Sequence, residues 1–567
     1  MAMTAPHAAA AVSNRRRGAL VLATLAVFLA AAIWPRLPAV TPASAPETEV
    51  SAARAMAQLE RIATAPRPSG SPQHAHAREQ IVGELVALGL PVEQNRGVFR
   101  HPLVSLVVPI VGSASTGTVL LMAHYDSVPR GPGAGDDGVG VVSWLEALRA
   151  LRASGWQPRN DVLLLLTDGE ENGLLGAHMF ARTDARVAKV KTIVNLEAIG
   201  NGGPAILFEL GPHNGARVRL FADTVARPAG SSFAEAVYHA LPNDTDLSVF
   251  LKRGTQGFNL ALACGSCAYH APHDTPANLD PRSVQHMAAT AAALARRLGD
   301  ADLGTLRAAD VTFFDLLGTS LIVWPRAWDA WLAVASLLLA IGMLWRARTG
   351  GRALVFELGR HAASVGLLTG LVVGVCWLGD QVLAWFVASP GWLPGNTTSA
   401  ALMFAGAVAL VAAASLPRGD VQPERLAGRV AIAALLWSLA GLAASLWLPG
   451  SAFAWTWPVL AVGLPAQLPP RWRESLPAQL LPFAACAAIG LPVLHLLTQL
   501  MAREPIVALG LVTVAVASAA RLLSAPLQSI ARENGCRRCL WLAGSLALLL
   551  AFVGARWLGW RGGALWP

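Results

Sequence analysis

Eight long apolar segments follow one another in the second half of the chain and restrict its fold more than any other feature. They lie near residues 328–346, 362–387, 398–416, 430–448, 452–468, 477–500, 505–523 and 540–558. An α-helix needs about 20 apolar residues to cross the hydrocarbon core of a bilayer. Charged residues make up only 14% of the chain, against about 25% in a soluble protein. We therefore expect residues 326–567 to form an α-helical, multispanning membrane domain of about eight helices.

The charges divide between the two halves of the chain. Residues 1–325 hold 27 basic and 27 acidic residues, whereas residues 326–567 hold 17 arginines and 8 acidic residues. These arginines gather in alternate loops, as at 346–360 and 418–429, and the positive-inside rule places such loops in the cytoplasm. The rule then places the segment 40–325 outside the cytoplasm. Because the basic excess follows the membrane topology, we expect a lipid bilayer as a partner and no nucleic acid.

The N-terminal region has the charge pattern of a membrane-targeting segment. A basic tail, residues 1–17, ends in three arginines and precedes the apolar run 18–34. A cleaved signal peptide has the same pattern, but Trp34-Pro35-Arg36 stands where small residues would mark a cleavage site. We expect an uncleaved transmembrane signal anchor at 18–34, followed by a Pro/Ala/Ser-rich linker at 35–48.

The amino-acid composition indicates the kind of organism from which the chain comes. Alanine and arginine are frequent and only three lysines occur, a usage typical of GC-rich bacteria. We therefore expect a multi-pass protein of a bacterial inner membrane, with the segment 49–325 in the periplasm. An internal membrane of a eukaryote is the alternative.

Residues 49–325 have the pattern of a folded α/β domain. Short apolar runs of strand length occur in "GTVLLMAHYD", "DVLLLLTDGEE", "KTIVNLEAIG", "AILFEL" and "GFNLALA". Amphipathic segments with helical periodicity lie between or beside them, as in "QHAHAREQIVGELVALG" and "RSVQHMAATAAALARRL". Apolar strands that alternate with helices predict a mixed, mostly parallel sheet covered by helices.

Polar side chains gather where these strands end. His124 and Asp126 end the first strand, Glu170 and Glu171 follow the next, and Glu197 ends the third. Ligand and catalytic sites of parallel sheets form beyond the carboxyl ends of the strands. The three groups are therefore expected to meet at one edge of the sheet.

Each polar group also has an ordinary structural explanation. The pair Asp136-Asp137 could cap the following helix, the pair Glu170-Glu171 could be solvated loop charge, and His270 could be a loop histidine. The order of all the groups within one domain favours a metal site instead, because imidazole nitrogens and carboxylate oxygens are both zinc ligands.

With this ordered motif, residues 50–300 resemble metallopeptidase family 28, the co-catalytic zinc exopeptidases that include aminopeptidase Y and glutamate carboxypeptidase II. The motif consists of H-x-D at 124–126, D-D at 136–137, E-E at 170–171, N-L-E at 195–197 and Y-H-x-x-x-D-T at 269–275. The segment "NDTDLSVFLKRGTQGFNLA" also resembles the family. A catalytic domain with many spans resembles the membrane-bound branch of the family, which includes the endoplasmic-reticulum metallopeptidase and the vacuolar membrane protease.

The resemblance implies a three-layer zinc-exopeptidase fold with two Zn²⁺ ions held by His124, Asp136, Glu171, Glu197 and His270. Asp136 would bridge the ions and form a cis peptide bond with Asp137. His124 and Glu197 would complete the shell of one ion, and Glu171 and His270 that of the other.

The resemblance also implies two catalytic groups besides the ligands. Asp126 would orient His124, and Glu170 would act as the general base. Zinc lowers the pKa of a bound water toward about 7, and an adjacent glutamate that is not a ligand can take the proton. The implied activity is that of an aminopeptidase acting on peptides.

Other functions remain open from the sequence. A carboxypeptidase of the same fold would carry the same ligands, and a transporter or receptor could use the domain for binding only. Asp380 and His495 lie inside expected spans, where ionisable groups are candidates for transport. Metallopeptidase family 20 usually inserts a whole domain before the last histidine, and here His270 lies only 73 positions after Glu197, which leaves too little room for it. Glutaminyl cyclase uses a single zinc ion, whereas this chain carries the five-ligand set.

Two cysteine pairs complete the sequence features. Cys264 and Cys267 precede His270, and an extracytoplasmic location favours a disulfide bond between them. Free thiols and metal ligation are the alternatives. Cys536 and Cys539 lie on the expected cytoplasmic side, and we interpret them as free thiols.

Overall fold

The computed structural model describes residues 37–99, 101–316, 318–347, 355–367 and 423–473, with short pieces at 370 and between 475 and 523. The expected signal anchor, most of the expected spans, and Asp380, His495, Cys536 and Cys539 lie outside the described residues. The chain divides into two compact units. Residues Pro35–Arg326 form the body of one, and the helices from Ala327 onward belong to the other.

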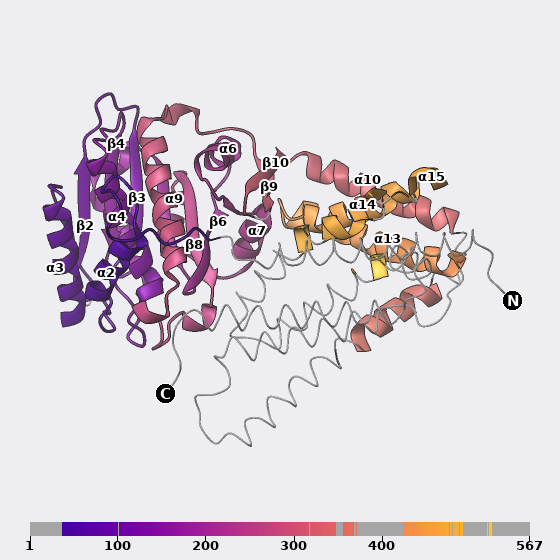
Figure 1. The fold of residues 1–567 in the computed structure, drawn as a ribbon, viewed down its shortest axis with the longest axis horizontal. Helices are drawn as coiled ribbons and strands as arrows, with labels where there is room; N and C mark the ends of the chain where they lie inside the picture. The colour runs from indigo at the N-terminus through magenta and orange to yellow at the C-terminus, as the bar shows by residue number, and fades with distance from the viewer. Residues whose placement is uncertain are drawn as a thin grey trace, which may run out of the picture. The chain divides into compact units, whose positions relative to one another are not determined.

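An eight-stranded sheet forms the centre of the first unit (Figure 1). Its strands follow the spatial order β1-β2-β4-β3-β5-β8-β6-β7. Their bounds are β1 Glu93–Val98, β2 Pro102–Ile110, β3 Thr118–His124, β4 Asp161–Thr167, β5 Val190–Ala198, β6 Gly202–Glu209, β7 Ala229–Gly230 and β8 Gln256–Cys264. The four central strands β4, β3, β5 and β8 run parallel. Strand β1 pairs antiparallel with β2, β2 with β4, and β6 with β8, whereas the short β7 runs parallel to β6. The expected mixed sheet is confirmed.

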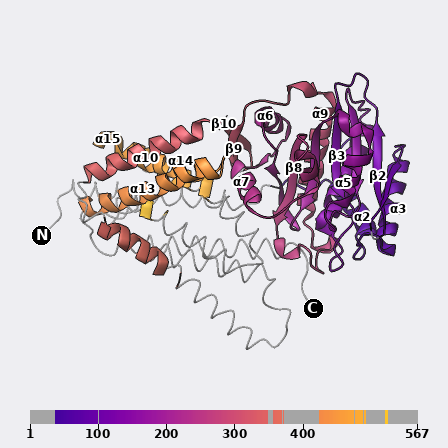
Figure 2. The same ribbon diagram turned by 180° about the vertical axis from the view of Figure 1, so that it is seen from behind.

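Helices cover both faces of this sheet, as the opposite views in Figures 1 and 2 show. They are α2 Ala52–Ile62, α3 Pro72–Ala87, α4 Gly140–Ala153, α5 Leu175–Thr183, α6 Gly215–Thr224, α7 Ser232–Ala240, α8 Asp246–Leu251 and α9 Pro281–Asp300. Strand β3 shows why two layers are needed. Val119 and Leu121 pack into the core beneath α2, α4 and α9, whereas Leu120 and Met122 pack into the core beneath α5 and α8. Alternate residues of a strand point to opposite faces, so a strand that is apolar throughout must be covered twice.

A polar residue followed by a proline marks the start of two of these helices. The side chain of Ser71 accepts a hydrogen bond from the main-chain N–H of His74 at the start of α3, and Pro72 occupies the first turn. Asp280 and Pro281 begin α9 in the same way. Such residues satisfy N–H groups that the first helical turn leaves unpaired, and proline has no N–H to satisfy there.

Residues 41–47, which we expected in the linker at 35–48, are hydrogen-bonded to the folded domain. The N–H of Thr41 donates to Gln285 of α9 (3.1 Å). The Arg54 guanidinium donates to the carbonyls of Ala43 and Ala45, and the Arg149 guanidinium to that of Glu47. Glu146 lies fully buried beneath this segment and pairs with both arginines, at 3.2 and 2.7 Å. This part of the expected linker is therefore attached to the domain surface.

A two-stranded hairpin ends the first unit, and apolar helices make up the described part of the second. The hairpin consists of β9 Val311–Leu316 and β10 Ser320–Pro325. The helices are α10 Trp328–Arg346, α13 Pro423–Trp447, α14 Phe453–Ala466 and α15 Pro470–Arg473. Within the described residues, Trp328–Arg346 and Arg425–Trp447 are long and apolar enough to cross a membrane. Both coincide with expected spans, and the remaining expected spans stay predictions.

Candidate metal centre

The polar groups of the motif meet at the carboxyl edge of the central strands, as expected. His124 is the last residue of β3 and pairs in register with Thr167, the last residue of β4. Glu170 and Glu171 lie in the loop that follows β4, and Glu197 lies near the end of β5, the other neighbour of β3. Neighbouring parallel strands end at the same edge, so residues far apart in sequence come together here.

The two aspartates of the D-D pair have different environments. They lie in the irregular turn Ala134–Val139 between β3 and α4, and a cis peptide bond joins them. The Asp137 carboxylate accepts hydrogen bonds from the main-chain N–H of His124 (3.3 Å) and of Gly140 (2.9 Å). Asp136 instead directs its carboxylate toward the two histidines. Asp137 therefore links the end of β3 to the start of α4, while Asp136 enters the site.

Two groups of donor atoms share Asp136. In the first, His124 Nε2 lies 3.1 Å from Asp136 Oδ1 and 3.6 Å from Glu197 Oε2. In the second, His270 Nε2 lies 3.1 Å from Asp136 Oδ2 and 3.0 Å from Glu171 Oε2. Within each group all donor atoms lie within 4.8 Å of one another. All five expected ligand residues are thus brought together, and each oxygen of Asp136 faces a different group.

The chemistry of these atoms fits a pair of cations. Glu171 Oε1 is buried and lacks a hydrogen-bond partner among the described residues, and Asp136 Oδ2 and His270 Nε2 are buried with only the ion pairs of the second group beside them. A buried polar atom without a partner costs about 1–3 kcal/mol, and a charged one costs more. Carboxylate oxygens and imidazole nitrogens that converge on one point match the ligand preferences of zinc.

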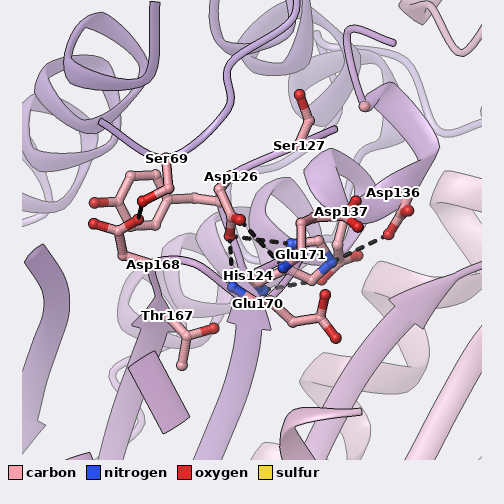
Figure 3. A network of polar contacts seen from close by, with 12 residues as sticks. Ser69, His124, Asp126, Ser127, Asp136, Asp137, Thr167, Asp168, Glu170 and Glu171 are labelled. Atoms are coloured by element: carbon pink, nitrogen blue, oxygen red, sulfur yellow. Dashed lines mark hydrogen bonds and ion pairs between the residues drawn. The ribbon is translucent and has the colours of Figure 1, made fainter. Parts of the chain in front are cut away.

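Asp126 connects the two sides of the site (Figure 3). Its carboxylate lies 3.6 Å from His124 Nδ1. It also accepts hydrogen bonds from the main-chain N–H groups of Glu170 (3.1 Å) and Glu171 (3.3 Å). Asp126 therefore contacts His124 as expected, and it also holds the loop that carries Glu170 and Glu171 through two main-chain hydrogen bonds.

The electrostatics reflect many acidic groups in a small buried volume. Burial raises the pKa of Glu170, and the nearby Glu197 carboxylate raises it further, against the lowering effect of His124. Burial lowers the pKa of His124, but the facing carboxylates, with Glu170 first, outweigh it and raise that pKa well above its usual range. The site therefore favours positive charge among its carboxylates.

Asp274, the aspartate of the last motif segment, holds the D-D turn in place. Its carboxylate accepts hydrogen bonds from the main-chain N–H groups of Gly135 (2.7 Å) and Asp136 (3.1 Å). The segment that carries His270 and the segment that carries Asp136 are thus joined directly.

A buried chain of side chains behind Glu197 was not predicted from the sequence. Asn195 Nδ2 donates to Glu197 Oε1 and to Asn259 Oδ1, both at 3.0 Å. Asn259 Nδ2 donates in turn to Glu209 Oε2 (2.9 Å). The quoted N-L-E and "GFNLA" segments contain both asparagines, but nothing in the sequence pairs them. Glu209 lies in β6 and gave no local signal at all.

Arg67 is a second buried group that sequence reasoning missed. Its side chain is fully buried and directed at the main chain between His124 and Asp136. The run "ATAPRPSG" that contains it looks like an ordinary loop.

The cysteine pair beside His270 is only partly described. Cys264 ends strand β8, and the side chain of Cys267 lies outside the described residues. The disulfide bond therefore stays a prediction.

Comparisons with known proteins agree with the sequence motif. The sequence profile of peptidase family M28 matches residues 105–295, which confirms the resemblance. Endoplasmic reticulum metallopeptidase 1 of Homo sapiens is 31% identical over 214 residues, covering 36% of this chain and 24% of that protein. The vacuolar membrane protease of Candida albicans strain WO-1 is 36% identical over 202 residues, covering 35% and 24%. The chain thus spans about a quarter of the length of these curated relatives.

Solved structures are similar at lower identity. An aminopeptidase from Aneurinibacillus sp. strain AM-1 is 14% identical, with a TM-score of 0.37 over 44% of this chain and 95% of that one. A zinc aminopeptidase from Bacillus subtilis is also 14% identical, with a TM-score of 0.34 over 44% and 95%.

Proposed function

Because residues 105–295 match the sequence profile of peptidase family M28, we propose that this chain is a membrane-anchored di-zinc exopeptidase that removes N-terminal residues from peptides. The observation that carries the proposal is the division of the Asp136 carboxylate between two donor groups. A carboxylate with one oxygen toward each donor group could hold two ions at the short separation that two-metal hydrolysis uses.

The donor groups assign the ligands in this proposal. His124 and Glu197 would hold one Zn²⁺ ion, Glu171 and His270 the other, and Asp136 both. Two bound ions would supply Lewis acidity there, toward a substrate carbonyl and toward a water whose pKa would fall toward neutral. Asp126 keeps His124 in one orientation, since a carboxylate opposite the second ring nitrogen selects the tautomer that can bind metal.

Glu170 is the proposed general base. Its main chain is held by Asp126, while its side chain takes no part in either donor group. A carboxylate with a raised pKa is suited to take a proton from the attacking water and to return it to the leaving amine. Adjacent Glu170 and Glu171 can then divide the work between proton transfer and metal binding.

The location is also part of the proposal. The two described apolar helices and the names of the relatives support a membrane protein. The relatives are named for the endoplasmic reticulum and the vacuolar membrane, so they lend no support to the expected bacterial inner membrane and periplasm. What remains proposed is a catalytic domain on the non-cytoplasmic side of a membrane.

A pair of matched substitutions tests this function. Purified full-length chain should digest a library of free peptides from their N-termini when loaded with zinc, and stop when a chelator is added. Glu170→Gln should keep its zinc while turnover falls by about 10²- to 10⁴-fold. Glu171→Gln should lose zinc first and activity as a consequence.

The contrast between the two variants carries the result. If Glu170→Gln loses zinc and Glu171→Gln keeps it, the two roles are reversed. Zinc binding without cleavage of any peptide by the unchanged chain would favour a binding-only domain. Cleavage from the C-terminus would make the chain a carboxypeptidase of the same fold.

A further inference from the structure

A single buried arginine is hydrogen-bonded to three main-chain carbonyls beside the candidate metal centre. Arg67 is fully buried. Its Nε donates to the carbonyl of Tyr125 (2.8 Å), its Nη2 to that of Gly133 (2.8 Å) and its Nη1 to that of Pro132. All three carbonyls belong to the segment that connects the H-x-D and D-D parts of the motif.

The main chain of Arg67 is bound to the same segment. Its N–H donates to Ser127 Oγ (2.9 Å), and its carbonyl accepts from the N–H of Ser127 (3.2 Å). The segment therefore contacts Arg67 at both its beginning and its end. Gly133 adopts a φ of +66°, and a Cβ there would lie 2.4 Å from the carbonyl oxygen of Asp136. The chain turns tightly at this point and directs its carbonyl at the guanidinium.

The charge of Arg67 is surrounded by acidic groups of the site. Asp274, Asp126, Asp136 and Asp137 all interact favourably with the guanidinium. An arginine keeps its charge in proteins, and a buried charge must be paired and hydrogen-bonded to be tolerated. Here the main-chain carbonyls supply the hydrogen bonds and the carboxylates supply the opposite charge.

We propose that Arg67 is a positioning residue for the metal centre, one that sets the distance between His124 and Asp136 and offsets part of the negative charge of the site. The inference rests on the proposed di-zinc function. Arg67 contacts neither metal nor substrate, so it acts only through the segment 125–137. A single side chain thereby couples the two motif parts that contribute ligands from β3 and from the following turn.

Arginine suits this position better than lysine. The guanidinium presents donors in a rigid planar fork, whereas an ammonium is a point charge on a flexible stem. A lysine side chain in place of Arg67 would keep the charge but could not reach the carbonyls of Tyr125, Pro132 and Gly133 together. The substitution Arg67→Lys therefore separates geometry from charge, and Arg67→Met removes both.

The test measures zinc affinity of the full-length chain in detergent, by competition with a chromophoric chelator. Loss of groups that orient metal ligands typically weakens metal binding by about 10- to 100-fold. We expect Arg67→Lys to fall in this range and Arg67→Met to bind zinc still more weakly. Substrate KM of zinc-saturated Arg67→Lys should stay close to that of the unchanged chain, because Arg67 is fully buried and out of reach of a substrate.

Arg217→Lys is the matched control. Arg217 is also buried and donates to main-chain carbonyls, those of Leu306 (3.2 Å) and Pro212 (2.9 Å). None of the candidate ligands is among the charged groups that act on Arg217. Its substitution should lower thermal stability and leave zinc affinity unchanged.

The outcomes separate this inference from the proposed function. If the unchanged chain binds no zinc, the proposed function fails and this inference with it. If the unchanged chain binds zinc and Arg67→Lys binds it equally well, only the role of Arg67 is refuted.

Should Arg67→Lys not fold, Ser127→Ala replaces it, since that change keeps the arginine and removes the hydroxyl that accepts from its N–H. If Ser127→Ala binds zinc as tightly as the unchanged chain, the role is refuted. A measurable loss of zinc affinity supports the role, and we expect this loss to be less than about 10-fold.

Discussion

Glu209 should make the stability of the peptidase domain depend on pH in a direction opposite to that of a typical glutamate. The side chain is 3% exposed and its carboxylate accepts a hydrogen bond from Asn259. Burial raises its pKa from 4.5 to about 7, and the neighbouring carboxylates of Glu235 and Asp244 add to the effect, against the lowering contribution of the hydrogen bond from Asn259. The folded domain therefore retains a proton on Glu209 at pH values where the unfolded chain has released it.

The sign and size follow from proton linkage. Between pH 4.5 and about 7 the folded state binds more protons than the unfolded state, so the free energy of unfolding falls as the pH rises. The stabilising contribution is fully present below pH 4.5 and is lost as the pH rises through about 7. At about 1.4 kcal/mol per pKa unit, the rise of the pKa from 4.5 to about 7 corresponds to roughly 3 kcal/mol in the free energy of unfolding. Glu209→Gln keeps an oxygen for Asn259 but carries no titrating proton, so it should gain stability relative to the unchanged chain as the pH rises.

The assay compares Glu209→Gln with the unchanged chain at pH 5 and pH 8. Pulse proteolysis in urea reports the folded fraction of the domain, and a chelator at both pH values keeps zinc binding out of the comparison. Glu60→Gln in α2 is the control, because that side chain is exposed and should shift both curves equally. If the stability difference between Glu209→Gln and the unchanged chain is the same at the two pH values, the reasoning from burial is wrong.

Further predictions concern the metal, the topology and the cysteines. Asp136→Ala should lose most bound zinc and nearly all activity, because both donor groups use that carboxylate; two zinc ions retained per chain would contradict the bridging role. A reporter that is active only in the cytoplasm, fused at residue 310, should stay silent, and a bright signal would reverse the topology. Mass spectrometry of unreduced protein should find Cys264 and Cys267 linked, whereas alkylation of both without reductant would exclude the bond.

The residue types of the site and their place at one sheet edge could be predicted from the sequence. His124, Glu170 and Glu197 each follow or end an apolar run of strand length. In a parallel sheet the carboxyl ends of such runs meet at one edge. The apolar runs report burial on both faces of the sheet, so they predicted that these three residues lie at one edge. The antiparallel strands β1 and β2, of which β1 is the edge strand, were not anticipated.

Which atoms meet was determined only by the tertiary structure. The sequence presents Asp136 and Asp137 as equivalent neighbours, yet one faces two histidines while the other holds main-chain N–H groups of β3 and α4. The difference arises from the direction in which the turn presents each side chain. That direction depends on contacts with Asp274, which lies 138 residues further along the chain.

The buried polar residues around the site could not be predicted from the sequence for the same reason. Asn195 meets Asn259 across 64 residues, and Asn259 meets Glu209 across 50. Arg67 meets Gly133 across 66 residues. Hydrophobic periodicity tells which face of a strand or helix is covered, but not which side chain of another element lies opposite a given position. The chain's own sequence therefore determined the class of fold and the kind of site, and the packing of distant segments determined which polar groups hold that site in place.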